Sequence, residues 1–255
     1  MSELVLNLAI LPKVQRALWP SFHEIPPGFV LYGGTALALR LGHRTSVDFD
    51  FFSSRPVDPD AFLSSIPFLR GGRVAQRSEN LLTLWVSPMP EERPVKVSFF
   101  GGLGLPVLER PDRPDPDGIV VASLHDLAGT KAKVINQRVE LRDYEDIAAV
   151  LDAGMTLPEI VAAAIAIFPG QVDYATTVSA ITYFEDGETK LFPASLKKKL
   201  RSAALGASPV RAPKPSYLSI EASAAAVGQT RAPRRRASLS SADGGGHAAS
   251  RGPDA

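Results

Sequence analysis

The pattern of hydrophobic and polar positions divides the chain into two parts. In the first part, strand patterns cover residues 29–32, 47–52, 80–86 and 94–100, and helical patterns cover residues 8–19, 35–41 and 58–68. From Ser123 onward the helical period dominates, through residues 123–139, 143–152, 157–168 and 172–184. The chain is therefore expected to be an α+β protein, in which a small mixed sheet with helices packed on it precedes a helical C-terminal half.

The end of the chain differs from the rest in composition. Residues 201–255 carry eight basic and three acidic residues, whereas residues 1–200 carry 20 basic and 24 acidic residues. The end also has few large apolar side chains, which favours disorder. We predict a first domain over residues 1–120, a helical domain over residues 121–204 and a disordered basic tail over residues 205–255. A basic tail can contact nucleic acid, but an incidental extension is the simpler interpretation.

Composition also excludes several classes of site. The chain has no cysteine, so disulfides, thiol catalysis and cysteine zinc sites are excluded, and its four histidines lack metal-ligand spacing. No apolar run approaches the ~20 residues that span a membrane, and the N-terminus lacks the pattern of a signal peptide. We expect a cytoplasmic protein with no membrane partner.

The most informative motif begins with the glycine turn Gly33-Gly34-Thr35. It follows a buried strand pattern and precedes a helical pattern that a hydroxyl residue opens. Free backbone N–H groups and the positive end of the helix dipole meet at such a turn, and glycine allows a phosphate to come close to the backbone. The turn therefore predicts a phosphate site, although a glycine pair alone is usually an ordinary turn.

Two aspartates follow within the same unit. The two-residue period of a strand places Asp48 and Asp50 on one face, while Val47, Phe49 and Phe51 line the other. Like charges on one face repel each other unless a cation lies between them, and carboxylates together with phosphate oxygens are ligands that Mg²⁺ prefers. We predict a magnesium site at Asp48 and Asp50; the alternative for an isolated acidic pair is a solvated edge.

A lysine lies in the apolar stripe of the helix that begins near residue 124. Lys131 shares this stripe with Leu124, Leu127, Val134 and Ile135. It must either reach the rim of the core or meet negative charge, for which a triphosphate or the Asp48/Asp50 site is the nearest candidate. On the next helix, Asp143 and Asp146 are either part of the site or members of a structural ion-pair cluster.

Together these segments resemble the AbiEii/AbiGii-type nucleotidyltransferase toxins of bacterial abortive-infection systems. The stretch from Leu31 to Phe52 resembles the opening motif of that family, and residues 126–131 and 142–146 resemble its later lysine and aspartate motifs. The resemblance covers about residues 10–200. It implies a polymerase-β-like nucleotidyltransferase domain in the first part, followed by the helical half.

The resemblance also implies an activity and partners. Members are thought to bind a nucleoside triphosphate with Mg²⁺ and to transfer nucleotide to an acceptor, in some cases a transfer RNA end, as the toxin partner of an antitoxin. By this resemblance Lys131 contacts the triphosphate, Asp48 and Asp50 hold the metal, and Asp143 or Asp146 serves the acceptor or the site geometry. The nucleotide-binding residues are expected to be Gly33, Gly34, Thr35, Arg44, Ser46 and Lys131.

Two observations leave alternatives open. Ser98 stands where many nucleotidyltransferases supply a third carboxylate, so a nucleotide-binding member without turnover is one alternative. Arg40 and Arg44 either contact phosphate or acceptor RNA, or belong to a solvated helix edge. A nucleotidyltransferase that modifies small molecules, of the antibiotic-modifying kind, has a similar glycine turn and acidic pair and is the other alternative.

Overall fold

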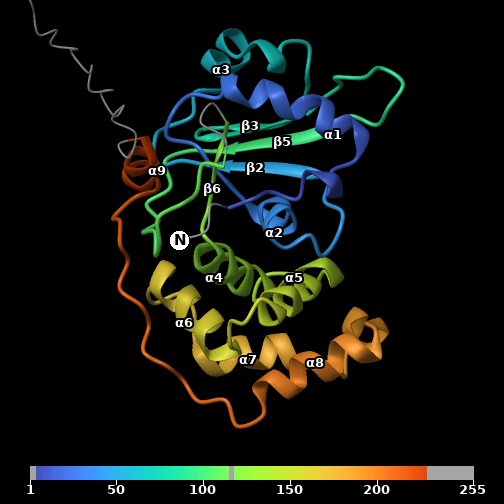
Figure 1. The fold of residues 1–255 in the computed structure, drawn as a ribbon, viewed down its shortest axis with the longest axis vertical. Coiled ribbons are helices and arrows are strands. Elements are labelled where there is room, and N and C mark those ends of the chain that lie inside the picture. The colour runs from blue at the N-terminus through green and yellow to red at the C-terminus, as the bar shows by residue number, and fades with distance from the viewer. Residues whose placement is uncertain (1–3, 115–117, 229–255) are drawn as a thin grey trace, which may run out of the picture.

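A six-stranded mixed sheet forms the centre of the first half (Figure 1). The computed structural model describes residues 4–114 and 118–228 and orders the strands β3-β4-β5-β2-β1-β6. Strand β2 is parallel to β5 and antiparallel to β1, β4 is antiparallel to β3 and β5, and β6 is parallel to β1. The strand bounds are β1 Val30–Tyr32, β2 Asp48–Phe52, β3 Arg73–Ser78, β4 Leu81–Val86, β5 Val95–Phe100 and β6 Val120–Val121.

Strand β2 sends its side chains to opposite faces of the sheet. Phe49 and Phe51 are buried and meet Phe22 edge-to-face, with ring centroids 4.7 and 5.2 Å apart. Asp48 and Asp50 alternate with these rings and therefore point to the other face, as the sequence predicts. Val47 was expected on the apolar face, but it precedes the strand and is 44% exposed. The aromatic core thus fixes the direction in which the two acids point.

Helices cover both faces of the sheet (Figure 1). The helices α1 (Lys13–Leu18) and α3 (Pro59–Ser65) lie on one side, and α2 (Gly33–Leu41) lies on the other. The predicted helix over residues 8–19 is shorter than expected because Pro12 precedes the first turn of α1, which agrees with the missing N–H of proline. The 3₁₀ segments are η1 Leu8–Ile10, η2 Trp19–Glu24, η3 Pro67–Leu69 and η4 Gly187–Leu191.

The second half is helical and packs beneath α2. Helix α4 contacts α2, α5, α6 and α7, so it connects the sheet-bearing half to the rest. Gly129 allows α4 to approach α6 closely, because a Cβ at this position would lie 2.8 Å from the backbone carbonyl carbon of Ala163. The bounds are α4 Leu124–Ile135, α5 Leu141–Asp152, α6 Leu157–Ile167, α7 Tyr174–Thr182 and α8 Ala194–Ala204.

Helix length bears on the question of membrane spans. Within residues 4–114 and 118–228, a single helix that is both long and apolar enough to cross a membrane does not occur. By length and composition, only α5 and α6 taken together reach that threshold, and the pair is bent by 115°.

The segment after α8 returns to the first half, and part of the predicted disordered tail is structured. Tyr217 pairs with Val107 through a β-bridge, and α9 (Ile220–Gly228) packs the fully buried Ile220 against the core. The prediction of disorder over residues 205–255 therefore does not hold for Tyr217 and α9, which a few apolar side chains anchor, whereas residues 207–215 form neither helix nor strand. The rest of the predicted tail, residues 229–255, lies outside the described residues.

Candidate functional site

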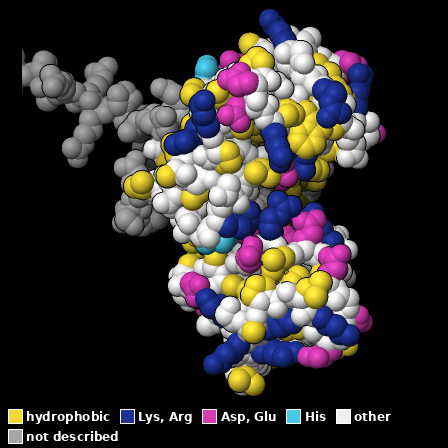
Figure 2. All heavy atoms as spheres, turned by 90° about the vertical axis from the view of Figure 1, so that its right-hand side faces the viewer, with side chains coloured by type: hydrophobic (Ala, Val, Ile, Leu, Met, Phe, Trp, Pro, Cys, Tyr) yellow, Lys and Arg dark blue, Asp and Glu magenta, His cyan; other side chains and the backbone are white. Residues whose placement is uncertain are grey.

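A cleft of about 550 Å³ lies between the sheet and helices α4 and α5. One wall consists of the glycine turn and residues of β2, β4 and β5, and it presents Asp48 and Asp50. The opposite wall consists of α4, the connection after it and the start of α5, and it presents Lys131, Arg138 and Arg142. Figure 2 shows lysine and arginine side chains, mixed with acidic ones, at the waist between the two halves of the molecule.

Strand pairing arranges the chemical groups of the sheet wall. In the parallel register of β2 and β5, Asp48 lies beside Lys96 and Asp50 lies beside Ser98. Lys96 Nζ is 3.1 Å from Asp48 Oδ2, and the Ser98 hydroxyl lies close enough to Asp50 to act against the rise in the pKa of its carboxyl. Burial raises the pKa of the Asp50 carboxyl; the Lys96 ammonium opposes this rise, and the Asp48 charge adds to it. The two carboxylates therefore influence each other, and Lys96 partly offsets their repulsion.

The glycine turn forms the start of α2, directly above the acids. Gly33 has φ +75°, a conformation that other residues rarely adopt, and a Cβ there would lie 2.8 Å from Asp50 Oδ2. A Cβ on Gly34 would overlap the Arg44 guanidinium. Both glycines line the cleft, but the space above them is already shared with Asp50 and Arg44. The glycines therefore make room for the protein's own charged side chains at the start of α2, where a helix N-terminus favours negative charge.

Thr35 and Ser46 connect the start of α2 to the start of β2. Their hydroxyl oxygens are 2.7 Å apart, and the Thr35 hydroxyl donates to the backbone carbonyl of Asp48. Both residues line the cleft, yet both are buried and engaged with each other. These contacts tie the backbone of Asp48 to the start of α2; a direct contact of Thr35 or Ser46 with nucleotide stays a prediction.

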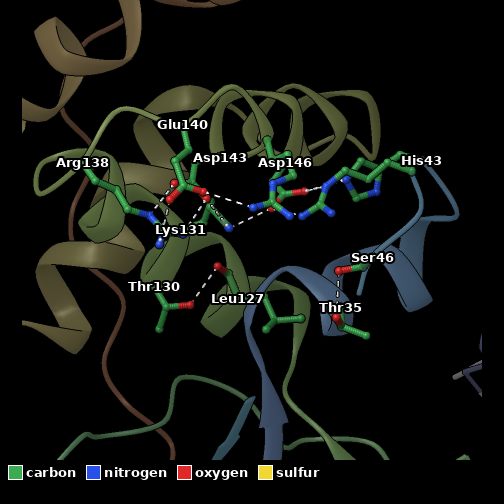
Figure 3. A network of polar contacts seen from close by, with 12 residues as sticks. Thr35, His43, Ser46, Leu127, Thr130, Lys131, Arg138, Glu140, Asp143 and Asp146 are labelled. Carbon is green, nitrogen blue, oxygen red and sulfur yellow. Dashed lines mark hydrogen bonds and ion pairs between the residues drawn. The ribbon is translucent and has the colours of Figure 1, made fainter. Parts of the chain in front are cut away.

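A buried ion network supports the helix wall (Figure 3). Lys131 Nζ lies 2.8 Å from Asp143 Oδ1 and 2.8 Å from Asp146 Oδ2, and its side chain is only 7% exposed. Lys131 also lowers the pKa of Asp50 through its charge, so it lies within electrostatic reach of the sheet wall. The sequence suggested a triphosphate or the Asp48/Asp50 site as the negative charge that Lys131 meets. In the structure its direct contacts are instead with the two aspartates of α5.

Asp146 is the best-satisfied member of this network. Its carboxylate accepts hydrogen bonds from Arg44 Nε at 2.7 Å and Arg44 Nη2 at 2.9 Å, and it pairs with His43 Nε2 at 2.7 Å. Burial alone would raise the pKa of Asp146, but the hydrogen bonds from His43 and Arg44 and the charge of Lys131 outweigh burial and lower it strongly. Asp146 is fully buried, which matches the structural ion-pair interpretation.

Asp143 lies closer to the cleft. It lines the cavity and pairs with Arg138, whose Nε is 3.0 Å from Asp143 Oδ2. Burial again acts to raise the pKa of Asp143, and the contacts with Arg138 and Lys131 reverse this effect and lower it. Asp143 therefore holds two cations, Lys131 and Arg138, at the cleft surface.

Lys96 and His43 were not predicted as site residues. Lys96 was within reach of sequence reasoning, because the two-residue period that places Ser98 toward the acids also places Lys96 there. His43 had no such signal, since its partner Asp146 is 103 residues away. Arg40 lies outside the cleft lining and pairs with Asp112 at 2.6 Å.

The residues present fit a metal ion that is bound together with a nucleotide. Within the described residues, no group of three or more histidine, aspartate or glutamate side chains is arranged to hold a metal ion alone. Asp48 and Asp50 supply two carboxylates at the cleft surface. Because Mg²⁺ in nucleotide sites is usually held by one or two carboxylates and the substrate phosphates, this donor set suits that ion.

Comparisons with known proteins identify the family and a similar fold. A family model described as "Nucleotidyl transferase AbiEii toxin, Type IV TA system" matches residues 16–214. Uncharacterized protein aq_aa25 of Aquifex aeolicus (strain VF5) is 32% identical over 167 residues, which cover 64% of this chain and 77% of that protein. The structure of MenT4, a nucleotidyltransferase toxin of Mycobacterium tuberculosis H37Rv, aligns with a TM-score of 0.53 and 15% identity over 74% of this chain and 80% of its own, which shows a similar fold. Because the family match includes both walls of the cleft, this chain belongs to the AbiEii family of nucleotidyltransferase toxins of type IV toxin–antitoxin systems.

Proposed function

We propose that this nucleotidyltransferase binds a nucleoside triphosphate with Mg²⁺ in the cleft and transfers the nucleotide to an RNA acceptor, such as a transfer RNA end. The observation that carries the proposal is the arrangement of the two walls: the paired acids of β2 and the glycine turn at the start of α2 face Lys131, Arg138 and Arg142 across one cavity. A volume of about 550 Å³ lies within the ordinary range of ligand pockets.

In this proposal the two walls have different tasks. Asp48 and Asp50 hold the metal ion, which when bound neutralises phosphate charge and orients the triphosphate. Lys131 and Arg138 stabilise the negative charge that develops on the leaving pyrophosphate. The acceptor hydroxyl oxygen forms a bond to the α-phosphorus as the bond from that phosphorus to the pyrophosphate oxygen breaks, and the hydroxyl proton passes to solvent.

The ion network prepares the cations for this task. Lys131 is held by two carboxylates, so its ammonium is fixed in place before the substrate arrives. Arg138 is fixed by Asp143 but remains half exposed, so it presents donors to the cleft. Preorganised charges stabilise a transition state without the cost of reorienting at the moment of reaction.

The mouth of the cleft suits a polyanionic acceptor. Arg142 lines the cavity with a side chain that is 55% exposed, and residues of the edge strand β3 line the opposite rim. On that strand the exposed Arg73 lies over the Trp85 ring, with 6.0 Å from the guanidinium carbon to the ring centroid. Exposed arginines and an aromatic surface are features that bind nucleic-acid backbones and bases. Membership of the toxin family implies a cognate antitoxin as a further partner.

The test is nucleotide transfer with labelled substrates. Each α-³²P-labelled NTP is incubated with Mg²⁺, the protein and one of three acceptor pools: total RNA, total protein or small aminoglycoside alcohols. We expect label in RNA, and loss of that label in the Asp48→Asn/Asp50→Asn variant. The control Asp60→Asn changes an exposed aspartate of α3 that pairs with Arg77, and it should leave transfer intact. Label in the small alcohols alone would contradict the proposal that RNA is the acceptor. Label that persists in the double variant would contradict the proposal that Asp48 and Asp50 hold the metal ion.

A further inference from the structure

Lys96 lies at the sheet wall without a role in the mechanism above. It extends from β5 to Asp48, and the two side chains are 32% and 31% exposed at the cleft surface. It bonds Oδ2, one of the two oxygens of the Asp48 carboxylate. Its charge also acts on Asp50, so its ammonium lies within reach of both acids.

The position of Lys96 is one that a cation should occupy. Two carboxylates on one strand face repel each other, and nearby positive charge is what makes both charges tolerable in a half-buried site. Lys96 supplies one positive charge there without any dissolved ion, and it is fixed to its strand by the backbone pairing with β2 and β4.

Ser98, two residues after Lys96 on β5, lacks the carboxylate that a second metal ion would need as a ligand. Ser98 lies beside Asp50 in the strand register and gives it a hydroxyl group instead of a third carboxylate. A second divalent cation would therefore share two carboxylates with the first and meet the Lys96 ammonium at the same place. Close positive charges of this kind repel strongly at short distance.

We propose that Lys96 serves as the second cation of the site, so that the complex with nucleotide takes up a single divalent ion. The ammonium remains beside Asp48, and the ion binds the face of the carboxylate pair that is turned toward the triphosphate. This inference rests on the proposed function, because it takes the carboxylate pair to be the metal site.

The test measures how many metal ions bind and how tightly they bind, and it does not depend on enzyme activity. The full-length protein is titrated with Mn²⁺, and the electron paramagnetic resonance signal of the free ion is followed. The titration is done in the presence and in the absence of an α,β-methylene NTP analogue that does not react. We expect one Mn²⁺ per wild-type complex. Without nucleotide, Lys96→Met should bind Mn²⁺ about tenfold more tightly, because the competing charge is gone while the apolar stem is kept. Lys199→Met, which removes a surface lysine paired with Asp152, is the matched control and should change nothing.

The results for Lys96 and for Asp50 test the inference and the proposed function separately. Two Mn²⁺ ions per wild-type complex, or unchanged Mn²⁺ affinity in Lys96→Met, would overturn the inference. If Lys96→Met instead weakens nucleotide binding in the absence of metal and leaves Mn²⁺ affinity unchanged, Lys96 is a phosphate ligand and the inference is also wrong. Asp50→Asn tests the proposed function separately: unchanged Mn²⁺ binding there would remove the metal site itself, whatever Lys96 does. Circular dichroism confirms that each variant is folded.

Discussion

Replacing Asp146 by asparagine tests whether the ion network supports the cleft. The Asp146 carboxylate is fully buried and contacts His43, Arg44 and Lys131 at 2.7–2.9 Å. Asparagine has nearly the same size but carries no charge, and it cannot accept both hydrogen bonds from Arg44 through two oxygens. Two cations would then remain in a buried region with one carboxylate partner fewer.

The expected loss of stability follows from the burial of these groups. Removal of one partner from a buried ion pair costs about 3–5 kcal/mol. Lys131 keeps its contact with Asp143, and the amide oxygen of Asn can still accept one hydrogen bond. We therefore expect a loss of about 3 kcal/mol in the free energy of unfolding, at the lower end of that range.

Urea unfolding at pH 7, followed by far-ultraviolet circular dichroism, measures this loss. The matched control is Asp152→Asn at the end of the same helix, where the carboxylate is 64% exposed and pairs with Lys199. An exposed pair of this kind contributes less than about 1 kcal/mol. If Asp146→Asn costs no more than Asp152→Asn, the network does not stabilise the fold and the reasoning is refuted.

The pH dependence of stability gives an independent check of the same network. The pKa of Asp146 is lower in the folded protein than the ordinary value of about 3.9 expected after unfolding. Its contribution is therefore complete above the unfolded-state pKa and is lost as the pH falls toward the folded-state pKa. Below about pH 5 the wild type should lose stability more steeply than Asp146→Asn. Parallel profiles for the two proteins would contradict this assignment.

Three further substitutions test the packing around the cleft. Gly34→Ala should displace Arg44 and weaken nucleotide binding in calorimetric titration, whereas Gly104→Ala, with open space around its Cβ, should not; equal binding by both would contradict the prediction. Thr35→Val removes the hydroxyl bonds to Ser46 and to the Asp48 carbonyl, and it should lower the free energy of unfolding by about 1–3 kcal/mol; an unchanged urea midpoint would argue against this tie. Gly129→Ala should destabilise the protein, since the added methyl meets the α6 backbone; helix propensity alone predicts a gain of about 1 kcal/mol, so a higher midpoint would refute the packing argument.

Local patterns predicted those parts of the site that depend on neighbours in the chain. The alternation in β2 depends on a two-residue period, so the common face of Asp48 and Asp50 followed from the sequence and is confirmed. The start of a helix at the glycine turn is confirmed as well. The apolar stripe predicted that Lys131 either reaches the rim of the core or meets negative charge; its side chain is only 7% exposed and its direct partners are Asp143 and Asp146.

Other features depend on contacts between distant residues and could not be predicted. Arg44 and Asp146 are 102 positions apart, and no periodicity records their bond. The edge strand β3 is exposed along its whole length, so it has no alternation of apolar and polar residues to reveal it. Ile220 is one of few large apolar residues in the segment after α8, and its burial against the distant core could not be read from the local pattern. In each case the missing information lies in the tertiary partner.

The most direct test of the account is a crystal structure with Mn²⁺ and a non-reacting NTP analogue. The account predicts anomalous density for Mn²⁺ at direct coordination distance from Asp48 and Asp50, with the triphosphate extending from the start of α2 toward Lys131 and Arg138. Nucleotide bound elsewhere, or Mn²⁺ bound away from the two carboxylates, would contradict the central claim that this cleft is where the nucleotide and its metal ion meet.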